Sequence, residues 1–208
     1  MEDILKVYER PYDERRPVVC MDETSKQLVK ETAIPLPMKP GKSMRYDTEY
    51  ERNGTSNIFI SFEPLKGKRT LKVTDRRTKT DWAYFIQALV DKDYPDTEKI
   101  VLVMDNLNTH TGSSLYETFP PAEARRILDR LEIHYTPKHG SWLNMAEIEL
   151  SHLSRQSLNR RIPDKDILIR ELSAWLSMRN KEASTVDWQF TTQDARIKLK
   201  TLYPIIGE

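Results

Sequence analysis

Two aspartates in this sequence directly follow apolar runs. Asp22 follows Val18–Met21, and Asp105 follows Ile100–Met104. Each run is apolar at successive positions, which is typical of a central strand covered on both sides. If the two strands are parallel neighbours, both carboxylates lie at the carboxyl edge of one sheet, where open α/β sheets place their sites.

A third acid, Glu147, stands in the first turn of a helix that the apolar spacing predicts over residues 144–161. Proteins hold Mg²⁺ through one or two carboxylates together with substrate phosphate oxygens. Two such ions on one phosphate group can activate an attacking oxygen and stabilise a leaving one, and a third acid would complete the second ion's shell. Glu149 is the rival candidate, but it lies about 200° further around the helix, so both cannot face one ion.

Each of these acids also has a purely structural interpretation, which the spacing alone leaves open. Asp22 begins the segment Asp-Glu-Thr-Ser, which is good turn material for closing a hairpin. Asp105 could start an Asx turn into the loop that follows it. Asn144 and Glu147 have the spacing of a capping box at a helix start.

The surrounding pattern predicts one α/β domain that contains a mixed sheet. We expect strands at residues 18–21, 26–31, 55–64, 68–78, 99–105 and 133–137, and helices at 79–93, 121–131, 144–161 and 164–182. Early strands without helices between them imply antiparallel hairpins, and the later alternation implies parallel crossovers with helices on both faces. Residues 1–16 resemble a loose lead-in, residues 17–182 form the domain, and residues 183–208 form a tail that packs on it or extends from it.

Composition excludes several classes of protein. The chain has 208 residues with 38% hydrophobic and 31% charged residues, which is typical of a soluble globular domain. Cys20 is the only cysteine, so an internal disulfide is excluded and a reducing compartment is expected. No apolar run approaches the length of a membrane helix. We expect a cytoplasmic protein in a prokaryote, or a nuclear one in a eukaryote.

The net charge of +1 is uninformative, but basic residues are concentrated in one segment. Residues 61–80 hold seven basic residues against two acids, which suggests a surface for phosphate groups, with a solvated hairpin as the alternative. The basic residues are Lys66, Lys68, Arg69, Lys72, Arg76, Arg77 and Lys79.

Further candidates lie beside the acids. Asn106 and His110 could orient Asp105 or contact a phosphate, or simply hydrogen-bond within their loop. Lys138 and His139 could bind a DNA backbone. Trp142 could stack on a base, or pack the helix start against the sheet. The four histidines and single cysteine lack the paired spacing of a zinc site.

Three segments carry a resemblance to a known family. VVCMDE, LVMDNLNTH and HYTPKHGSWLNMAEIE closely resemble the acidic blocks of DDE transposases of the mariner superfamily, specifically its bacterial insertion-sequence branch. The match includes the Asp-Asn followed by His in the second block and the Trp-Leu-Asn…Glu run of the third. It extends from about Arg16 to the TLYP near the end.

The resemblance implies a ribonuclease-H-like catalytic domain with a five-stranded mixed sheet, whose first and fourth strands carry the aspartates. It assigns the triad to Asp22, Asp105 and Glu147, because the family's third acid follows Leu-Asn by three residues; Asn144, Asn106 and His110 then support the triad. It also implies Mg²⁺, with Mn²⁺ as a substitute and two ions in the site. The expected partners are transposon-end and target DNA and a second copy of the chain, with no membrane.

Two departures from the family pattern shape the expected function. The interval between Asp105 and Glu147 is longer than in animal relatives, with LYETFPPAEARR as the extra length. The helix-turn-helix modules that usually read transposon ends do not precede Met1, so we expect end recognition to lie outside this chain. The expected activity is cleavage and strand transfer at transposon ends. The alternatives are a ribonuclease-H-like nuclease and a non-catalytic, inhibitory DNA-binding or dimerising fragment of a truncated element.

Overall fold

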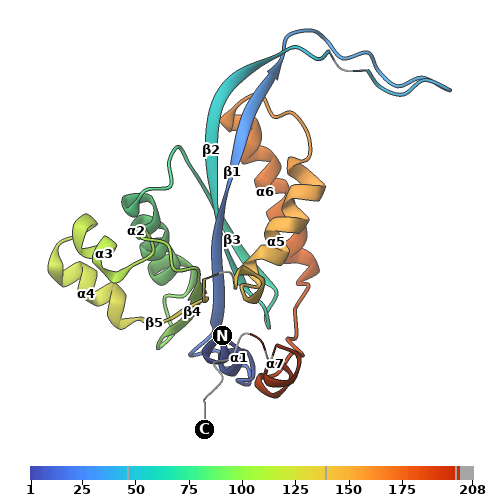
Figure 1. The fold of residues 1–208 in the computed structure, drawn as a ribbon. Helices are drawn as coiled ribbons and strands as arrows, with labels where there is room; N and C mark the ends of the chain where they lie inside the picture. The colour runs from blue at the N-terminus through green and yellow to red at the C-terminus, as the bar shows by residue number, and fades with distance from the viewer. Residues whose placement is uncertain (46, 139, 200, 202–208) are drawn as a thin grey trace.

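The chain forms a five-stranded sheet between two layers of helices (Figure 1). The computed structural model describes residues 1–45, 47–138, 140–199 and 201. The strands are β1 (Val18–Glu31), β2 (Tyr50–Glu63), β3 (Lys68–Thr74), β4 (Ile100–Met104) and β5 (Leu131–Tyr135). The α-helices are α1 (Glu2–Tyr8), α2 (Lys79–Ala88), α3 (Gly112–Thr118), α4 (Pro121–Asp129), α5 (Ala146–Leu153), α6 (Lys165–Glu182) and α7 (Thr192–Lys198).

The strand order is β3-β2-β1-β4-β5, which confirms the predicted mixed sheet. β1 pairs antiparallel with β2 and parallel with β4, and β4 pairs parallel with β5. β2 and β3 are antiparallel, so β3 runs in the same direction as β1. The carboxyl ends of β3, β4 and β5 therefore lie toward the same edge of the sheet.

Alternation along the strands divides the core into two layers. Val19 and Met21 of β1 pack with the layer that contains α2, α3 and α4, whereas Cys20 packs with the layer that contains α1, α5 and α6. Figure 1 shows α2, α3 and α4 on one side of the sheet and α5 and α6 on the other. Because both faces are covered, β4 is buried along its whole length, as its continuous apolar run predicts.

Several element boundaries differ from the sequence prediction. The strands expected at 18–21 and 26–31 are one continuous strand, β1, because the polar residues between them pair with β2. The expected lead-in begins with α1, whose Ile4, Leu5 and Val7 are buried in the core. The helices expected at 79–93 and 144–161 remain α-helical only to Ala88 and Leu153, and each continues as a π-helical turn. The helix α3 lies in a polar segment where no element was predicted.

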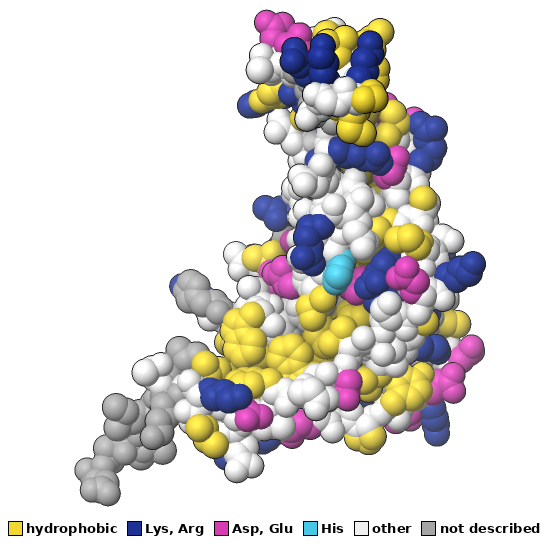
Figure 2. Space-filling view, turned by 90° about the vertical axis from the view of Figure 1, so that its right-hand side faces the viewer, with side chains coloured by type: hydrophobic (Ala, Val, Ile, Leu, Met, Phe, Trp, Pro, Cys, Tyr) yellow, Lys and Arg dark blue, Asp and Glu magenta, His cyan; other side chains and the backbone are white. Residues whose placement is uncertain are grey.

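The ribbon of β1 and β2 continues well beyond the helices as a projecting arm (Figure 1). Its tip carries exposed apolar residues, including Ile34, Leu36 and Met38, among exposed basic residues such as Lys39 and Lys42. Figure 2 shows both kinds of side chain at the end of this arm. No helix in the described part of the chain is both long enough and apolar enough to span a bilayer.

Candidate active site

The parallel pairing of β1 and β4 brings the two aspartates to the same level of the sheet. Cys20 pairs with Val103, and Asp22 and Asp105 each lie two residues further along. Asp22 stands inside β1, opposite Ile60 of β2, so it does not close a turn. Asp105 follows the last residue of β4 at the carboxyl edge. The predicted parallel pairing of the two strands is therefore present, but only Asp105 ends its strand: β1 continues for nine residues beyond Asp22 because its polar residues pair with β2.

Glu147 is joined to this edge through Asn144. The Asn144 amide nitrogen donates to Oδ2 of Asp22 at 3.1 Å and to the backbone oxygen of Met21 at 2.9 Å. These bonds tie the segment before α5 to β1. The side chain of Asn144 is thus not paired with Glu147 in a capping box, and the cap residue of α5 is Met145, without a side-chain cap bond. Glu147 is exposed in the first turn of α5.

The pKa of Asp22 is shifted by its buried position and by the charges near it. Burial is the main cause that raises this pKa from 3.8 to about 7, and repulsion by Glu147 and Asp105 raises it further. The backbone N–H of Glu23, which donates to Oδ1 of Asp22 at 2.8 Å, opposes this rise. A buried carboxylate that faces two others is destabilised in its charged form, and a cation between them would relieve that cost.

Glu149, the rival third acid, faces away from this edge. Its side chain is 1% exposed and forms ion pairs with Arg69 and Arg179. Arg69 is itself buried, so its predicted role in binding DNA is wrong in this fold: its guanidinium neutralises Glu149 inside the protein. Alternation along β3 turns Arg69 toward α5, whereas Lys68 and Lys72 lie on the opposite face, over Tyr94 and Tyr84.

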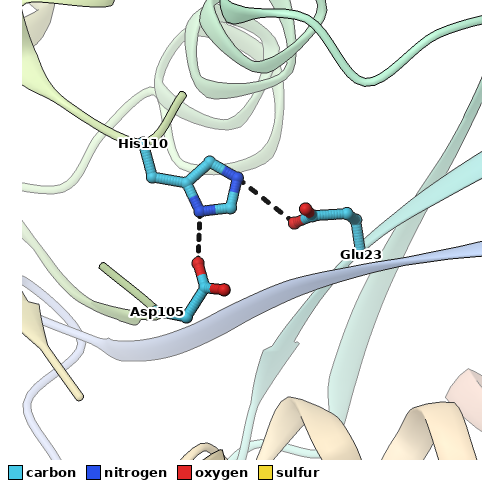
Figure 3. Close-up of side chains that lie close together, drawn as sticks. All are labelled: Glu23, Asp105 and His110. Carbon is cyan, nitrogen blue, oxygen red and sulfur yellow. Dashed lines mark hydrogen bonds and ion pairs between the residues drawn. The ribbon is translucent and has the colours of Figure 1, made fainter. Parts of the chain in front are cut away.

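A histidine between two carboxylates lies beside Asp105 (Figure 3). Nδ1 of His110 is 2.5 Å from Oδ1 of Asp105, and Nε2 is 3.2 Å from Oε2 of Glu23. Burial acts to lower the pKa of His110, but its bonds to Asp105 and Glu23 more than offset this and raise the pKa to about 9. Sequence reasoning missed Glu23. The available signal was an acid directly after Asp22, at the strand position that faces the apolar helix α2.

The predicted basic residues are distributed over both ends of β3. Arg76 and Arg77 are exposed just beyond its carboxyl end, and Arg77 lies 4.0 Å from Glu23 of the site. Lys66 is exposed in the β2–β3 turn at the other end. Lys68 is partly buried and donates to the backbone oxygen of Asp93 at 2.6 Å. Lys72 is also partly buried, and burial lowers its pKa.

The remaining candidates flank the start of α5. Lys138 is exposed in the segment after β5, and Asn106 is exposed directly after Asp105. Trp142 is 46% exposed, and its ring stacks on Trp188 of the C-terminal segment with 6.3 Å between centroids. The packing partner of Trp142 is therefore the C-terminal segment rather than the sheet, and stacking on a base stays a prediction. His139 lies outside the described residues.

The donor set suits a hard divalent cation. Asp22, Asp105 and Glu147 offer carboxylate oxygens, the ligands that Mg²⁺ and Mn²⁺ prefer. The ligand atoms of Glu23, Asp105 and His110 also lie within 4.8 Å of one another. In that group, however, each ring nitrogen faces a different carboxylate, so the imidazole itself stands where a bridging ion would be.

Fold and site together define a ribonuclease-H-like domain with carboxylates at the carboxyl edge of its mixed sheet. The sequence profile of the DDE superfamily endonuclease matches residues 17–169. The chain therefore belongs to the DDE superfamily of endonucleases. No curated protein matches the sequence significantly.

Solved structures of a mariner transposase share the fold. The Mos1 mariner paired end complex with Mn aligns with a TM-score of 0.58 at 16% identity, over 88% of this chain and 54% of that one. The Mos1 strand transfer complex aligns with a TM-score of 0.57 at 13% identity, over 91% of this chain and 60% of that one. This chain thus spans a little over half the length of the proteins in those complexes. At such identities, the likeness establishes the ribonuclease-H-like fold.

Proposed function

We propose that this chain is the catalytic domain of a transposase, which cleaves DNA strands at transposon ends and joins them to target DNA in a reaction that needs divalent cations. The observation that carries the proposal is the register of β1 and β4, which places Asp22 and Asp105 at one level of the sheet, while Asn144 joins the start of α5, and with it Glu147, to Asp22. Membership of the DDE endonuclease family supports the same reading.

In this proposal Asp22 and Asp105 hold divalent cations jointly, and Glu147 completes the shell of one of them. Two Mg²⁺ ions, or Mn²⁺ in their place, would supply Lewis acidity at the scissile phosphate. Asn144 and the backbone N–H of Glu23 orient Asp22, because they donate to Oδ2 and to Oδ1 of its carboxylate. Asn106, exposed beside Asp105, is placed to contact the DNA backbone.

The DNA-binding surface that we propose surrounds these acids at the carboxyl edge. Arg76 and Arg77 border it beyond β3, and Lys138 borders it beyond β5. Trp142 offers a partly exposed indole for stacking with a base. Lys68 and Lys72 contribute positive charge from the face of β3 that carries α2, and Lys66 lies furthest from the acids.

The first test is Mn²⁺ binding in the presence of short duplex DNA, because a scissile phosphate supplies part of each ion's shell. We expect Asp105→Ala to lose the binding seen with the unaltered protein. Asp129→Ala is the matched control, since Asp129 is exposed on α4 and pairs with Arg125. Equal Mn²⁺ binding by a folded Asp105→Ala variant would show that Asp105 has only a structural role, and it would rule out the proposed triad as a metal site.

The second test separates a transposase from a nuclease on the same fold. A pre-cleaved transposon end with a free 3′ hydroxyl is incubated with target DNA and Mg²⁺, and joined products are measured. Joining supports the transposase, whereas cleavage without joining identifies the nuclease. A fragment that only binds DNA or dimerises would do neither, and changing Asp105 would then alter no activity.

The wider setting of the proposal follows from the family resemblance. The Mos1 structures are described as paired-end complexes, so we infer that this chain acts as a homodimer on two DNA ends. We also infer an insertion-sequence origin and a prokaryotic cytoplasmic location, supported by the motif resemblance and the single reduced cysteine. Residues 17–182 form the catalytic unit in this proposal, and the segment after them, including α7, packs on it.

A further inference from the structure

We propose that Glu23 and His110 are positioning residues that hold Asp105 in its metal-binding orientation before any cation arrives. This proposal rests on the proposed function, since it concerns the same carboxylate. It adds two residues that touch neither the DNA nor the ions. Figure 3 shows the three side chains in a row, with the imidazole in the middle.

The first step of the argument is the bond to Asp105. In the described part of the chain, the hydrogen bond to the Asp105 side chain comes from His110 and uses Oδ1. The Asp105 side chain is 31% exposed, so without this bond it could rotate in solvent. With Oδ1 engaged, Oδ2 is the atom available to a cation. The bond therefore selects both the rotamer and the oxygen that binds.

The second step is that His110 is itself immobile. Its side chain is 1% exposed and stacks on Trp82 of α2, with 5.8 Å between ring centroids. Its backbone oxygen accepts a hydrogen bond from the hydroxyl of Tyr135 at 2.8 Å, and its backbone N–H donates to Leu107 at 2.9 Å. A ring fixed in this way can impose its geometry on a neighbour that is partly exposed.

The third step concerns Glu23, a carboxylate that is 3% exposed on the face of β1 opposite to Asp22. Its Oε2 is buried and has no hydrogen-bond partner of regular geometry in the described residues, yet lies 3.2 Å from Nε2 of His110. A buried carboxylate oxygen is costly unless a donor or cation faces it. The ring of His110 is the group that faces this oxygen, with Nε2 toward Glu23 and Nδ1 toward Asp105. Glu23 thus fixes the orientation of the ring that holds Asp105.

The consequence is a site that is ordered in advance. Asp22, Asp105 and Glu147 repel one another, and such groups would turn apart without a cation. The pair of Glu23 and His110 holds Asp105 in place against that repulsion. Residues that orient metal ligands typically contribute 10–100-fold to metal affinity or activity, so we expect an effect of about that size here.

The test measures Mn²⁺ dissociation constants with short duplex DNA present, for variants of the pair. We expect His110→Phe, which keeps a ring but has no donor, and Glu23→Ala each to weaken Mn²⁺ binding by about 10–100-fold. Glu23→Gln should restore binding to within a few-fold, because the amide can still hydrogen-bond Nε2. If Glu23 acted only through packing, Glu23→Ala and Glu23→Gln would differ in their free energy of unfolding. Their Mn²⁺ affinities would then not show the loss and the recovery expected here.

The chain supplies a matched control in His134, which also lies between two carboxylates. Its Nδ1 is 2.7 Å from Asp3 and its Nε2 is 3.0 Å from Glu132, but no catalytic acid is part of this group. His134→Phe should leave Mn²⁺ binding unchanged. Unchanged binding in the folded His110→Phe variant as well would overturn the positioning proposal while leaving the proposed function intact.

A metal-free measurement keeps the two proposals separate. In the protein without cations, the ring proton on Nδ1 of His110 should give a far-downfield NMR signal, because its bond to Asp105 is short. Asp105→Ala should abolish that signal, and Glu23→Ala should broaden it. Absence of the signal would overturn the positioning proposal by itself. Failure of the unaltered protein to bind Mn²⁺, with the signal present, would instead count against the proposed function.

Discussion

Arg69 on β3 holds Glu149 on α5 through two hydrogen bonds of 2.8 Å, one from Nε to Oε2 and one from Nη2 to Oε1. Arg179 of α6 donates to Oε1 of the same carboxylate at 2.9 Å. This buried group joins a strand and two helices. Because Glu147 precedes Glu149 by two residues, the ion pairs also fix the helix that presents the proposed third acid.

Glu149→Gln should strongly destabilise the fold. The change leaves the buried guanidinium of Arg69 without its anion and removes one of the two carboxylates that Arg179 contacts, and breaking a buried pair in this way costs about 3–5 kcal/mol. Urea unfolding measures the loss. Glu171→Gln is the control, because its pair with Arg160 is exposed and such pairs contribute about 0–1 kcal/mol. Similar losses for both variants would show that the buried pairs are no stronger than surface ones.

Gly67→Ala should destabilise the contact between the β2–β3 turn and the end of α6. Gly67 has φ +69°, and an added Cβ would lie 2.4 Å from the backbone oxygen of Ala183. Gly54→Ala is the matched control, with φ +84° and nothing within 4 Å of the added atom. We expect about 1–2 kcal/mol from backbone strain at either glycine, and a clearly larger loss of unfolding free energy at Gly67. Equal losses would mean that the turn can move away from α6.

The sequence predicted the pairing of the two strands that carry Asp22 and Asp105 better than their surroundings, for a physical reason. Asp22 and Asp105 follow continuous apolar runs, and only a central strand pair accounts for two such runs in a single small domain. Glu147 was separated from Glu149 by the family motif rather than by periodicity. The structure supplies the cause, since Glu149 is neutralised by two arginines that lie 80 and 30 residues away in the chain.

Long-range pairing explains what the sequence did not predict. Local charge predicts a DNA-binding role for Arg69, because the sequence does not show that the fold brings Glu149 of α5 into contact with this arginine of β3. Glu23 was missed for the same reason, since its partner His110 belongs to a loop that only the fold brings near. The buried face of α1 was missed because its short apolar pattern stands among charged residues.

The free energy of unfolding should depend on Glu132 between about pH 4.5 and about pH 2. Burial acts to raise the pKa of Glu132, but hydrogen bonds from Arg10, His134 and Arg16 lower it from 4.5 to about 2. A carboxyl group whose pKa is lower in the folded protein stabilises the fold above its unfolded pKa. That contribution is lost as the pH falls through the folded value.

Two measurements check this dependence. NMR titration should place the Glu132 midpoint near 2. Acid unfolding should show that the stability difference between the unaltered protein and Glu132→Gln shrinks across the same range of pH. A midpoint at the ordinary value for glutamate, or a constant difference, would show that the arginines do not hold this carboxylate in solution.

The salt dependence of DNA binding should be set by Arg76 and Arg77 rather than by Lys66. The two arginines lie at the edge of the sheet that carries Asp105, whereas Lys66 lies at the other end of β3. Each lost phosphate contact lowers the slope of log K against log salt by about 0.9. Arg76→Gln with Arg77→Gln should therefore weaken binding and reduce the slope by up to about 1.8, as measured by fluorescence anisotropy over a range of NaCl concentrations.

Lys66→Gln should leave the slope nearly unchanged, as should Arg15→Gln with Arg125→Gln, whose side chains are 78% and 69% exposed. A slope that falls equally for all of these variants would indicate diffuse attraction by net charge, and the proposed DNA surface at the carboxyl edge would be withdrawn.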